Sequence, residues 1–267
     1  MVATKVTLPE DLGSKSFVMF DDLVSRGKLF YSESQSEIVS HNGFEFEFRI
    51  SPALKRKPYL ERDDPKRTTE KGPFLHPDPE FVAAQPQTRD LNLGDVEAAR
   101  AVMAALKPTL GPQLMIYNCG VDAGSSQGHK HVQIFPQPPR LLLYPQRATS
   151  DSDKRSIDSR IPGVPNQHFV LRLTQGVTPE QTYRSLQRLV CATRETQTTG
   201  GRGYDYNVIM AEDWICVVPR RLVGRDGVGA NGAGMVGLVW LRDQAERDGW
   251  DSFGLTDHLV QLGLPRG

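Results

Sequence analysis

The sequence predicts an α+β fold, in which helices and antiparallel strands are mixed rather than strictly alternating. Residues 44–51 alternate apolar and charged side chains, which is typical of a strand with one buried face. Residues 93–106 repeat apolar side chains at helical spacing. Two further stretches, 112–136 and 204–221, each read as strand, turn and strand, so antiparallel pairs are expected beside the helices.

The composition is that of a globular protein with no net charge. The chain has 267 residues, of which 38% are hydrophobic and 24% charged, and its 32 basic side chains balance 32 acidic ones. This length allows one large domain or two small ones. Proteins that bind duplexes usually carry a basic excess, so we expect no nucleic-acid partner, whereas a local cluster could still bind a small anion.

The cysteines and the apolar runs indicate a compartment. Cys119, Cys191 and Cys216 are odd in number and lack C-x-x-C spacing, which argues against a disulfide framework or a zinc finger. The N-terminus has no apolar core of a signal peptide, and no apolar run is long enough to span a bilayer. We therefore expect a cytoplasmic protein, with the nucleus as a second location and no membrane association.

The N-terminal half predicts helices, one strand and a long loop. Residues 9–33 place apolar side chains at mostly helical spacing and predict one or two helices. In the strand 44–51, three phenylalanines share one side and charged residues the other. Residues 52–86 are dense in proline and charge and predict a long loop, of a length that is typical of a binding loop. The helix 93–106 carries acidic residues in its first turn.

The C-terminal half predicts two hairpins separated by a linker and a helix. Residues 112–118 and 129–136 form the strands of the first hairpin, with a glycine-rich turn between them. Residues 146–165 are rich in Ser, Asp and Arg and predict a surface linker. The remaining predicted elements are a strand at 167–173, a helix at 178–197, a hairpin at 204–221 that turns at Glu212-Asp213, a loop at 229–237 and a short helix at 254–265.

The stretch YNCGVDAGSSQGHKHVQIFPQP, residues 117–138, carries the polar residues of greatest interest. On a strand, alternate side chains share a face and their Cα atoms lie about 6.5–7 Å apart. His129, His131 and Gln133 are therefore expected on one face. The opposite face would carry Lys130, Val132 and Ile134, of which the last two are expected in the core.

Three interpretations of the two histidines compete. They could be hydrogen-bonded structural residues at a strand end. They could bind zinc, but a catalytic zinc site needs a third ligand, and Gln133 is a poor one. They could serve nucleophilic catalysis, because an imidazole is mostly neutral at pH 7 and can attack phosphorus when its other nitrogen is held by a hydrogen bond.

The residues before the histidines favour the third interpretation. The run from Gly124 to Gly128 offers successive main-chain N–H groups and two serine hydroxyls, a composition that suits a concave anion site. Alone, such a run is as readily a flexible turn. Followed directly by a potential histidine nucleophile, it indicates phosphate chemistry. It lacks the G-K-[ST] end of a P-loop, so a kinase or NTPase is not indicated.

The residues YNCGVDAGSSQGHKHVQIFP resemble the active-site segment of the fungal-type diadenosine tetraphosphate phosphorylases, or ATP adenylyltransferases, of the histidine-triad superfamily. The transferase branch of that superfamily places Gln third in its H-x-H-x-H motif, as Gln133 does here. The resemblance continues through FEFRISPALKRKP, GPFLHPDPEF, YDYNVIMAEDWICVVPRR, NGAGMVGLVWL and LVQLGLP. It implies a histidine-triad-like antiparallel sheet with flanking helices.

The resemblance also implies an activity and a site. His131 would attack the α-phosphate of diadenosine tetraphosphate and expel ATP, and inorganic phosphate would then remove the adenylyl group as ADP. His129 and Gln133 would assist this chemistry. The residues implied to bind substrate are Lys57, Asn118, Gly124, Ser125, Ser126, Gln127, Tyr206, Asn207 and Met210. No metal site and no covalent cofactor are implied, Mg²⁺ accompanying the nucleotide stays open, and the chain would be a monomer or a homodimer.

The chain departs from the family between Phe81 and Asp90. Relatives carry there two or more strands and an Asn-Lys pair, whereas here the proline-rich loop runs almost directly into a helix. We therefore expect part of the central sheet to be missing after residue 83. The expected regions are a catalytic one, 1–145, with an internal deletion near 83–87, the linker 146–165, and a C-terminal one, 166–267, packing on the same sheet. A catalytically impaired, nucleotide-binding homologue is the alternative function.

Overall fold

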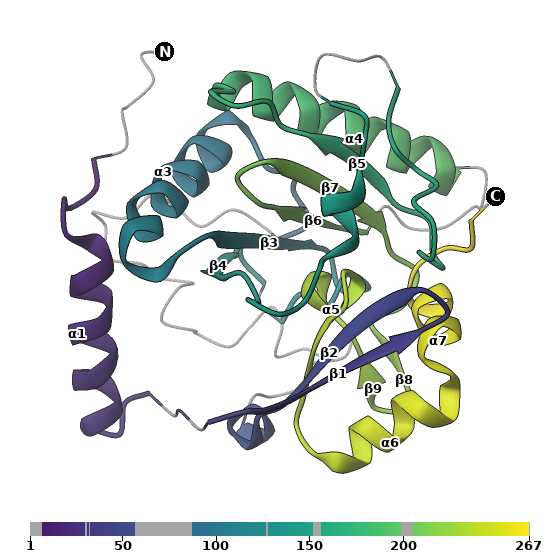
Figure 1. Ribbon diagram of the computed structural model, residues 1–267, viewed down its shortest axis with the longest axis horizontal. Helices are drawn as coiled ribbons and strands as arrows, with labels where there is room; N and C mark the ends of the chain where they lie inside the picture. Colours follow the sequence, from purple (N-terminus) through teal and green to yellow (C-terminus); the bar gives the residue numbers. More distant parts are fainter. Residues whose placement is uncertain are drawn as a thin grey trace.

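The centre of the molecule is a five-stranded antiparallel sheet (Figure 1). The computed structural model describes residues 7–29, 31, 33–56, 87–126, 128–151, 156–198 and 205–266. The strands, in their order across the sheet, are β4 (Val132–Pro136), β3 (Gln113–Cys119), β6 (Tyr206–Met210), β7 (Trp214–Pro219) and β5 (Phe169–Arg172). Every neighbouring pair is antiparallel, so both predicted hairpins are confirmed, the second with its turn at Glu212-Asp213.

Two long helices cover one face of this sheet (Figure 1). They are α3 (Leu93–Leu110) and α4 (Pro179–Thr198). Helix α3 begins with a capping box, in which the Asn92 side chain accepts from the Asp95 amide and the Asp95 carboxylate accepts from the Asn92 amide. Apolar residues of both helices pack against alternate residues of the strands, among them Met103, Leu186, Leu189, Met115, Tyr117, Val208 and Met210. We refer to this side of the sheet as the helix face.

A second layer covers the opposite face. It contains a three-stranded sheet of β1 (Gln35–His41), β2 (Phe44–Ile50) and β10 (Leu238–Leu241), in which β10 runs parallel to β2. The other elements of this layer are helices α5 (Gly232–Met235), α6 (Gln244–Phe253) and α7 (Leu255–Leu262) and the short pair β8 (Gly224–Arg225) and β9 (Val228–Gly229). Its phenylalanines and Trp250 join the residues Leu114, Ile116, Ile209, Cys216 and Val218 of the central sheet in one core.

Three elements lie outside these layers. Helix α1 (Leu12–Ser25) packs against α3. Thr109 of α3 lies so close to Gly13 of α1 that any side chain at position 13 would clash with it. Two 3₁₀ turns, η1 (Pro52–Arg56) and η2 (Tyr144–Arg147), complete the described elements. None of the helices in the described ranges combines the length and apolarity needed to cross a membrane.

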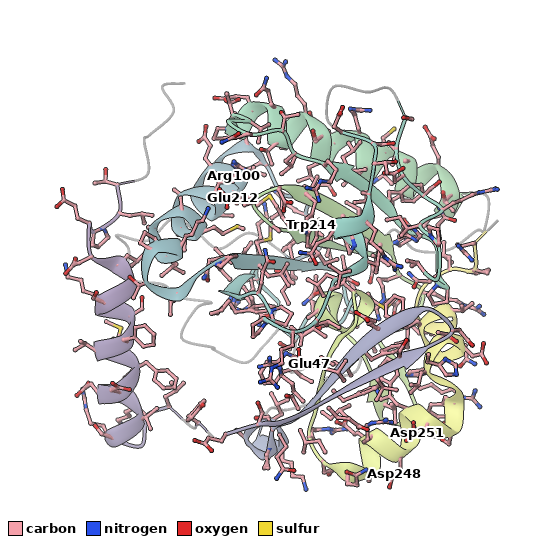
Figure 2. The ribbon with its side chains drawn as sticks, viewed as in Figure 1. Glu47, Arg100, Glu212, Trp214, Asp248 and Asp251 are labelled. Atoms are coloured by element: carbon pink, nitrogen blue, oxygen red, sulfur yellow. The ribbon has the colours of Figure 1, made fainter. Side chains whose placement is uncertain are left out.

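Most predicted elements are present, and the single helix in residues 9–33 agrees with the prediction of one or two helices. Strand β1 was not predicted, and the expected loop 229–237 contains α5. Helix α6 was also missed, because Trp250 is its only buried apolar side chain, while Asp248 and Asp251 are exposed (Figure 2). Trp214, in contrast to these exposed residues, lies fully buried in the core (Figure 2).

The segment 146–165 is more ordered than a surface linker. The Asp158 carboxylate accepts hydrogen bonds from the Thr149 and Ser150 amides, at 2.5 and 2.6 Å. Asp158 also pairs through its main chain with Val170 of β5, and Ile161 is buried. Residues 152–155 lie outside the described ranges. The described part of this segment therefore packs along the edge strand β5.

The two sides of this segment interleave. Strands β3 and β4 from the N-terminal side and β5, β6 and β7 from the C-terminal side share one sheet. Strand β10, from the C-terminal side, completes the sheet that β1 and β2 begin. Of the expected deletion site near 83–87, only Gln87 lies within the described ranges, because residues 57–86 are outside them. Within those ranges β4 is an edge strand.

We expect Phe46→Ala to lower the free energy of unfolding by about 3–5 kcal/mol, because it would leave a cavity in the core between the second layer and the central sheet. The Phe46 side chain is fully buried, stacks on Phe48 at 5.6 Å and meets the Trp250 ring edge-on at 6.1 Å. Ile38→Ala on the paired strand β1 is the matched control. Its side chain is 46% exposed, so its loss should change stability by less than about 0.5 kcal/mol. Urea unfolding of both variants measures the difference, and equal losses would contradict it.

Stability should fall as the pH drops from about 6.5 to about 4, because His168 must gain a proton. Its Nε2 accepts from the Ile161 amide at 3.1 Å and its Nδ1 donates to the Asn166 carbonyl at 2.8 Å, so the neutral ring is bound. Burial lowers the pKa of His168 to about 4. The unfolded chain binds the proton first, and the folded state loses about 3 kcal/mol over this window.

Urea unfolding across this pH range measures the effect. The slope should be shallower in His168→Gln than in the wild type. Burial also lowers the pKa of His258 to about 4, and that contribution stays in both proteins. Identical slopes would show that His168 does not carry the effect.

Candidate active site

A cleft lies beside the edge strand β4, between the central sheet and the segment that carries α5 and β10. One part, which we call the histidine part, has a volume of about 690 Å³ and is lined by His131, Gln133 and Arg49 among others. The adjoining asparagine part has about 230 Å³ and is lined by Asn118 and Ser126 among others. Both parts share the wall residues Leu54, Gln133, Asn231 and Trp240, so they form one continuous depression.

The polar residues of the histidine segment share the cleft face, as the alternation predicts. Strand β4 begins at Val132, and its register pairs Gln133 with Ile116, a cleft-face residue of β3. His131 and Gln133 both line the cleft. The ring centroids of His129 and His131 are 5.9 Å apart, with the planes nearly perpendicular. These side chains therefore lie on one side of the chain.

The intervening residues point to the helix face. Lys130 donates to the Asp95 carboxylate of α3 at 2.7 Å and to the Asp90 carbonyl at 3.0 Å. Val132 and Ile134 pack against the core between the sheet and the helices. The predicted packing of Val132 and Ile134 against the core is thus confirmed.

His129 is a buried and neutral histidine. Its side chain is 8% exposed, and burial lowers its pKa below the ordinary value. A histidine whose pKa is below 6.5 is mostly uncharged at neutral pH. It can therefore act as a hydrogen-bonding neighbour of His131, but it is not a source of positive charge.

The glycine-rich loop forms a tight turn and only part of it faces the cleft. The Gly124 amide donates to the Val121 carbonyl at 2.9 Å and the Ser125 amide to the Gly120 carbonyl at 3.3 Å. These two amides close the turn, so they are not directed at an anion. Gly124 has φ +84°, and a side chain there would meet Asn231 at 3.0 Å, which explains the glycine. Ser125 is buried, while the exposed Ser126 lines the asparagine part.

Asn118 and Asn207 join two strands across the cleft face. The Asn118 Oδ1 accepts from the Asn207 Nδ2 at 2.8 Å and from the Gly232 amide at 2.9 Å. The Asn207 Nδ2 also donates to the Ala123 carbonyl at 2.7 Å. Asn118 lines the cleft, whereas Asn207 is fully buried behind it. Asn207 therefore holds Asn118, the glycine-rich turn and α5 together instead of lining the cleft.

Arg220 lies behind this pair, and its position was not predicted. Its guanidinium donates to the Asn207 Oδ1 at 2.8 Å and to four main-chain carbonyls, those of Ala123, Leu222, Ala230 and Leu262, at 2.7–3.3 Å. The side chain is 2% exposed, and burial lowers its pKa to about 9. Arg220 thus stays charged at neutral pH. Its neighbours Arg221 and Arg225, by contrast, are exposed.

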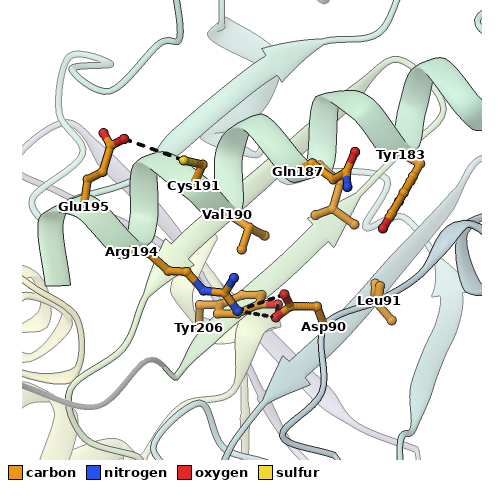
Figure 3. Close-up of a pocket in the computed structure, with 10 residues that line it drawn as sticks. Asp90, Leu91, Tyr183, Gln187, Val190, Cys191, Arg194, Glu195 and Tyr206 are labelled. Carbon is orange, nitrogen blue, oxygen red and sulfur yellow. Dashed lines mark hydrogen bonds and ion pairs between the residues drawn. The ribbon is translucent and has the colours of Figure 1, made fainter. Parts of the chain in front are cut away.

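Tyr206 and Met210 lie on the helix face, away from the cleft. Along β6, Tyr206, Val208 and Met210 share the helix face, while Asn207 points to the opposite face. The Tyr206 hydroxyl donates to the Asp90 carboxylate at 2.6 Å, and Arg194 of α4 donates to both oxygens of that carboxylate at 2.8 Å (Figure 3). A cavity of about 370 Å³ lies between these residues and α4. The grouping of Tyr206 and Met210 with Asn207 is therefore corrected by the alternation of the strand.

Two predicted residues, Lys57 and Gln127, lie outside the described ranges. Gln87, which the sequence did not single out, lies at the end of β3, and its side chain contacts the main chain of Asn118 and His131. An isolated glutamine after a proline-rich loop carries no pattern, so no signal in the sequence could have found it. In the described ranges no three His, Cys, Asp or Glu side chains gather as metal ligands would.

Two family models match the chain on either side of residues 146–161. The ATP adenylyltransferase C-terminal domain matches residues 162–265, and the Ap4A phosphorylase N-terminal domain, where Ap4A is diadenosine tetraphosphate, matches residues 82–145. Diadenosine 5',5'''-P1,P4-tetraphosphate phosphorylase 2 of Saccharomyces cerevisiae is 23% identical over 293 residues, which cover 89% of each chain. Protein APA1 of the same yeast is 26% identical over 179 residues, 60% of this chain and 55% of that protein.

Solved structures share the fold. The crystal structure of yeast Ap4A phosphorylase Apa2 superposes with a TM-score of 0.79 at 20% identity, covering 98% of this chain and 100% of that one. The same enzyme in complex with Ap4A gives 0.76 at 21% identity with the same coverage. The predicted antiparallel sheet with flanking helices is thereby confirmed as this fold.

Arg220→Met should lower the free energy of unfolding by about 3–4 kcal/mol, because it leaves several buried oxygens without a donor. Arg221→Met removes a neighbouring, exposed arginine and should change stability by less than about 0.5 kcal/mol. Urea midpoints and slopes for the two variants make the comparison. A similar loss in both would mean that the buried hydrogen bonds of Arg220 do not stabilise the walls of the cleft.

Proposed function

We propose, since the chain belongs to the Ap4A phosphorylase (ATP adenylyltransferase) family of the histidine-triad-like superfamily, that it is a nucleotidyltransferase which phosphorolyses diadenosine tetraphosphate to ADP and ATP. His131 is the proposed nucleophile. One relative named for this activity matches 89% of the chain. The yeast relative was solved in complex with Ap4A, which supports this dinucleotide as the substrate.

The reaction proceeds in two balanced steps. In the first, a ring nitrogen of His131 attacks the α-phosphorus, an N–P bond forms, and the P–O bond to the leaving group breaks, so ATP departs with the electron pair. In the second, an oxygen of inorganic phosphate attacks the same phosphorus and the N–P bond breaks. ADP is released and the imidazole is restored. The covalent intermediate makes the kinetics ping-pong.

One observation carries the proposal: His131 opens into the same depression that Asn118 and Ser126 line. A nucleophile that adjoins a polar pocket can meet a phosphate bound there, and such proximity is a large part of phosphoryl-transfer catalysis. Gln133 extends the line of His129 and His131 along the cleft face. Its amide can donate a hydrogen bond to phosphate oxygens and has no proton to titrate.

Local positive charge compensates for the absence of a net charge on the chain. The Arg220 guanidinium lies behind the asparagine pair, in a medium where its charge is poorly screened. Arg49 and Arg242 line the two parts of the cleft, where they also pair with Glu47 and Glu246. These groups would attract a polyphosphate and stabilise the charge on its equatorial oxygens.

We also propose the conditions under which the enzyme works. Mg²⁺ is proposed as a companion of the nucleotide phosphates, which are its usual ligands. The three free cysteines fit the reducing cytoplasm that the sequence predicts. The partners are the dinucleotide, ATP, ADP and inorganic phosphate, and no oligomeric state is preferred.

His131→Ala should abolish the formation of ADP and ATP from Ap4A and phosphate, with kcat reduced by about 10⁴-fold or more, because the covalent route is lost. His41→Ala is the matched control, since His41 lies in the second layer, next to Thr256. It should retain wild-type turnover. Mass spectrometry of wild-type enzyme mixed with Ap4A, but without phosphate, should show one adenylyl group on the peptide that contains His131.

Other product patterns would reject the proposal. Two ADP molecules, or AMP and ATP formed without any need for phosphate, would indicate a hydrolase. Tight adenine-nucleotide binding in calorimetry without turnover would support the catalytically impaired homologue instead.

A further inference from the structure

The ladder between β3 and β4 stops one residue short of the nucleophile. Its last pair is Tyr117 with Val132. Had the ladder continued, the main chains of Asn118 and His131 would have been the next to pair. In their place stands the side chain of Gln87, from a segment far away in the sequence.

The Gln87 amide takes over the role of a strand partner. Its Oε1 accepts a short hydrogen bond from the His131 N–H. Its Nε2 donates to the Asn118 carbonyl at 2.7 Å and, more weakly, to the His131 carbonyl at 3.4 Å. The Gln87 amide thus connects the main chain of His131, the proposed nucleophile, to the main chain of Asn118, which lines the asparagine part of the cleft.

Gln87 is itself firmly held. Its side chain is 4% exposed. Its main-chain N–H donates to the Gly128 carbonyl at 3.2 Å, just before the histidines. The Tyr117 hydroxyl lies 2.8 Å from the Gln87 carbonyl and 2.5 Å from the Arg89 carbonyl. Such contacts leave the side chain little freedom to follow a displaced histidine.

The next residues are fixed from the helix face. The Asp90 carboxylate accepts from the Tyr206 hydroxyl and from Arg194 (Figure 3). The Asp90 carbonyl accepts from Lys130, the residue between the two histidines. The segment from Gln87 to Asp90 is therefore clamped by α4 and β6 on one side and contacts the histidine segment on the other.

We propose that Gln87 is a positioning residue for His131, which acts by holding the main chain at the nucleophile through its side-chain amide. Tyr206 supports it from the opposite side of the sheet. This proposal rests on the proposed function of His131. In-line attack tolerates little displacement, since a shift of about 1 Å can cost on the order of 10²-fold in rate. An uncharged amide also fixes the main chain without adding a negative charge near an anionic substrate.

Gln87→Met tests the proposal, because it keeps the length of the side chain and removes both polar atoms. We expect kcat for phosphorolysis to fall about 10- to 100-fold while KM for Ap4A changes less than about twofold. The rate of adenylyl-enzyme formation in a single turnover, expressed per folded molecule, should fall by the same factor. A residue that only stabilised the fold would lower the folded fraction and leave that rate unchanged.

Gln113→Met is the matched control. Gln113 is another buried glutamine, at the far end of the same strand β3, and its amide donates to the Gly111 carbonyl at 2.7 Å. We expect a comparable loss of stability and no change in kcat. Tyr206→Phe is the second variant, should Gln87→Met fail to fold. It removes one donor to Asp90 while Arg194 remains, so kcat should fall several-fold, although the hydroxyl lies on the helix face.

Hydrogen exchange gives a readout that does not depend on activity. The His131 amide should be protected in the wild type and exchange faster in Gln87→Met, whereas the Ile116 amide inside the β3–β4 ladder should not change. Wild-type kcat in both Gln87→Met and Tyr206→Phe, or an unprotected His131 amide in the wild type, would overturn the proposal. Absence of ADP and ATP from the wild-type reaction would instead overturn the proposed function, and the catalytic role of Gln87 with it.

Discussion

The site depends on the period-two alternation of three neighbouring strands that are covered on both faces. In β3, β4 and β6 every residue must point either to the cleft and second layer or to the helices, because no third direction exists in a sheet. This constraint places His131, Gln133, Asn118 and Asn207 on one side. It places Lys130, Tyr117 and Tyr206 on the other. A slip of one residue in one of these strands would move that strand's side chains to the opposite face, so a slip in β4 would turn Gln133 away from the cleft and toward the helices.

A buried polar layer connects this alternation to the chemistry. Asn118, Asn207 and Arg220 form a continuous set of hydrogen bonds from the cleft to the interior, and the guanidinium is satisfied by an amide and main-chain carbonyls. Burying a charge is costly unless its donors are all used, and here the loops at both sides of the cleft supply the acceptors. The same contacts that offset the cost of burial therefore also fix the turn at Ala123 and the segment at Ala230.

The helix face contributes to the site without lining the cleft. Tyr117, Tyr206 and Arg194 hold the short segment from Gln87 to Asp90, and this segment reaches under the histidine segment. Tyr206 was expected at the substrate because the family resemblance implied it. Its place on the opposite side gives it a different role, that of a support for the residue which we propose to position His131.

The sequence by itself determined the fold class, most strands and helices, both hairpins and the face shared by His129, His131 and Gln133. These features follow from local periodicity, which is readable in a single segment. The motif and its surroundings also identified the family. Strand β1 was missed, since its side chains are mostly exposed and show no apolar period.

Only the tertiary structure decided which distant residues meet the motif. The contact of Gln87 with His131 joins residues 44 positions apart, the hydrogen bond from Arg220 to Ala123 joins residues 97 apart, and the pairing of Leu238 in β10 with Glu47 in β2 joins residues about 190 apart. Such contacts leave no trace in local spacing, because a hydrogen bond between distant segments requires only that the folded chain brings one donor and one acceptor together.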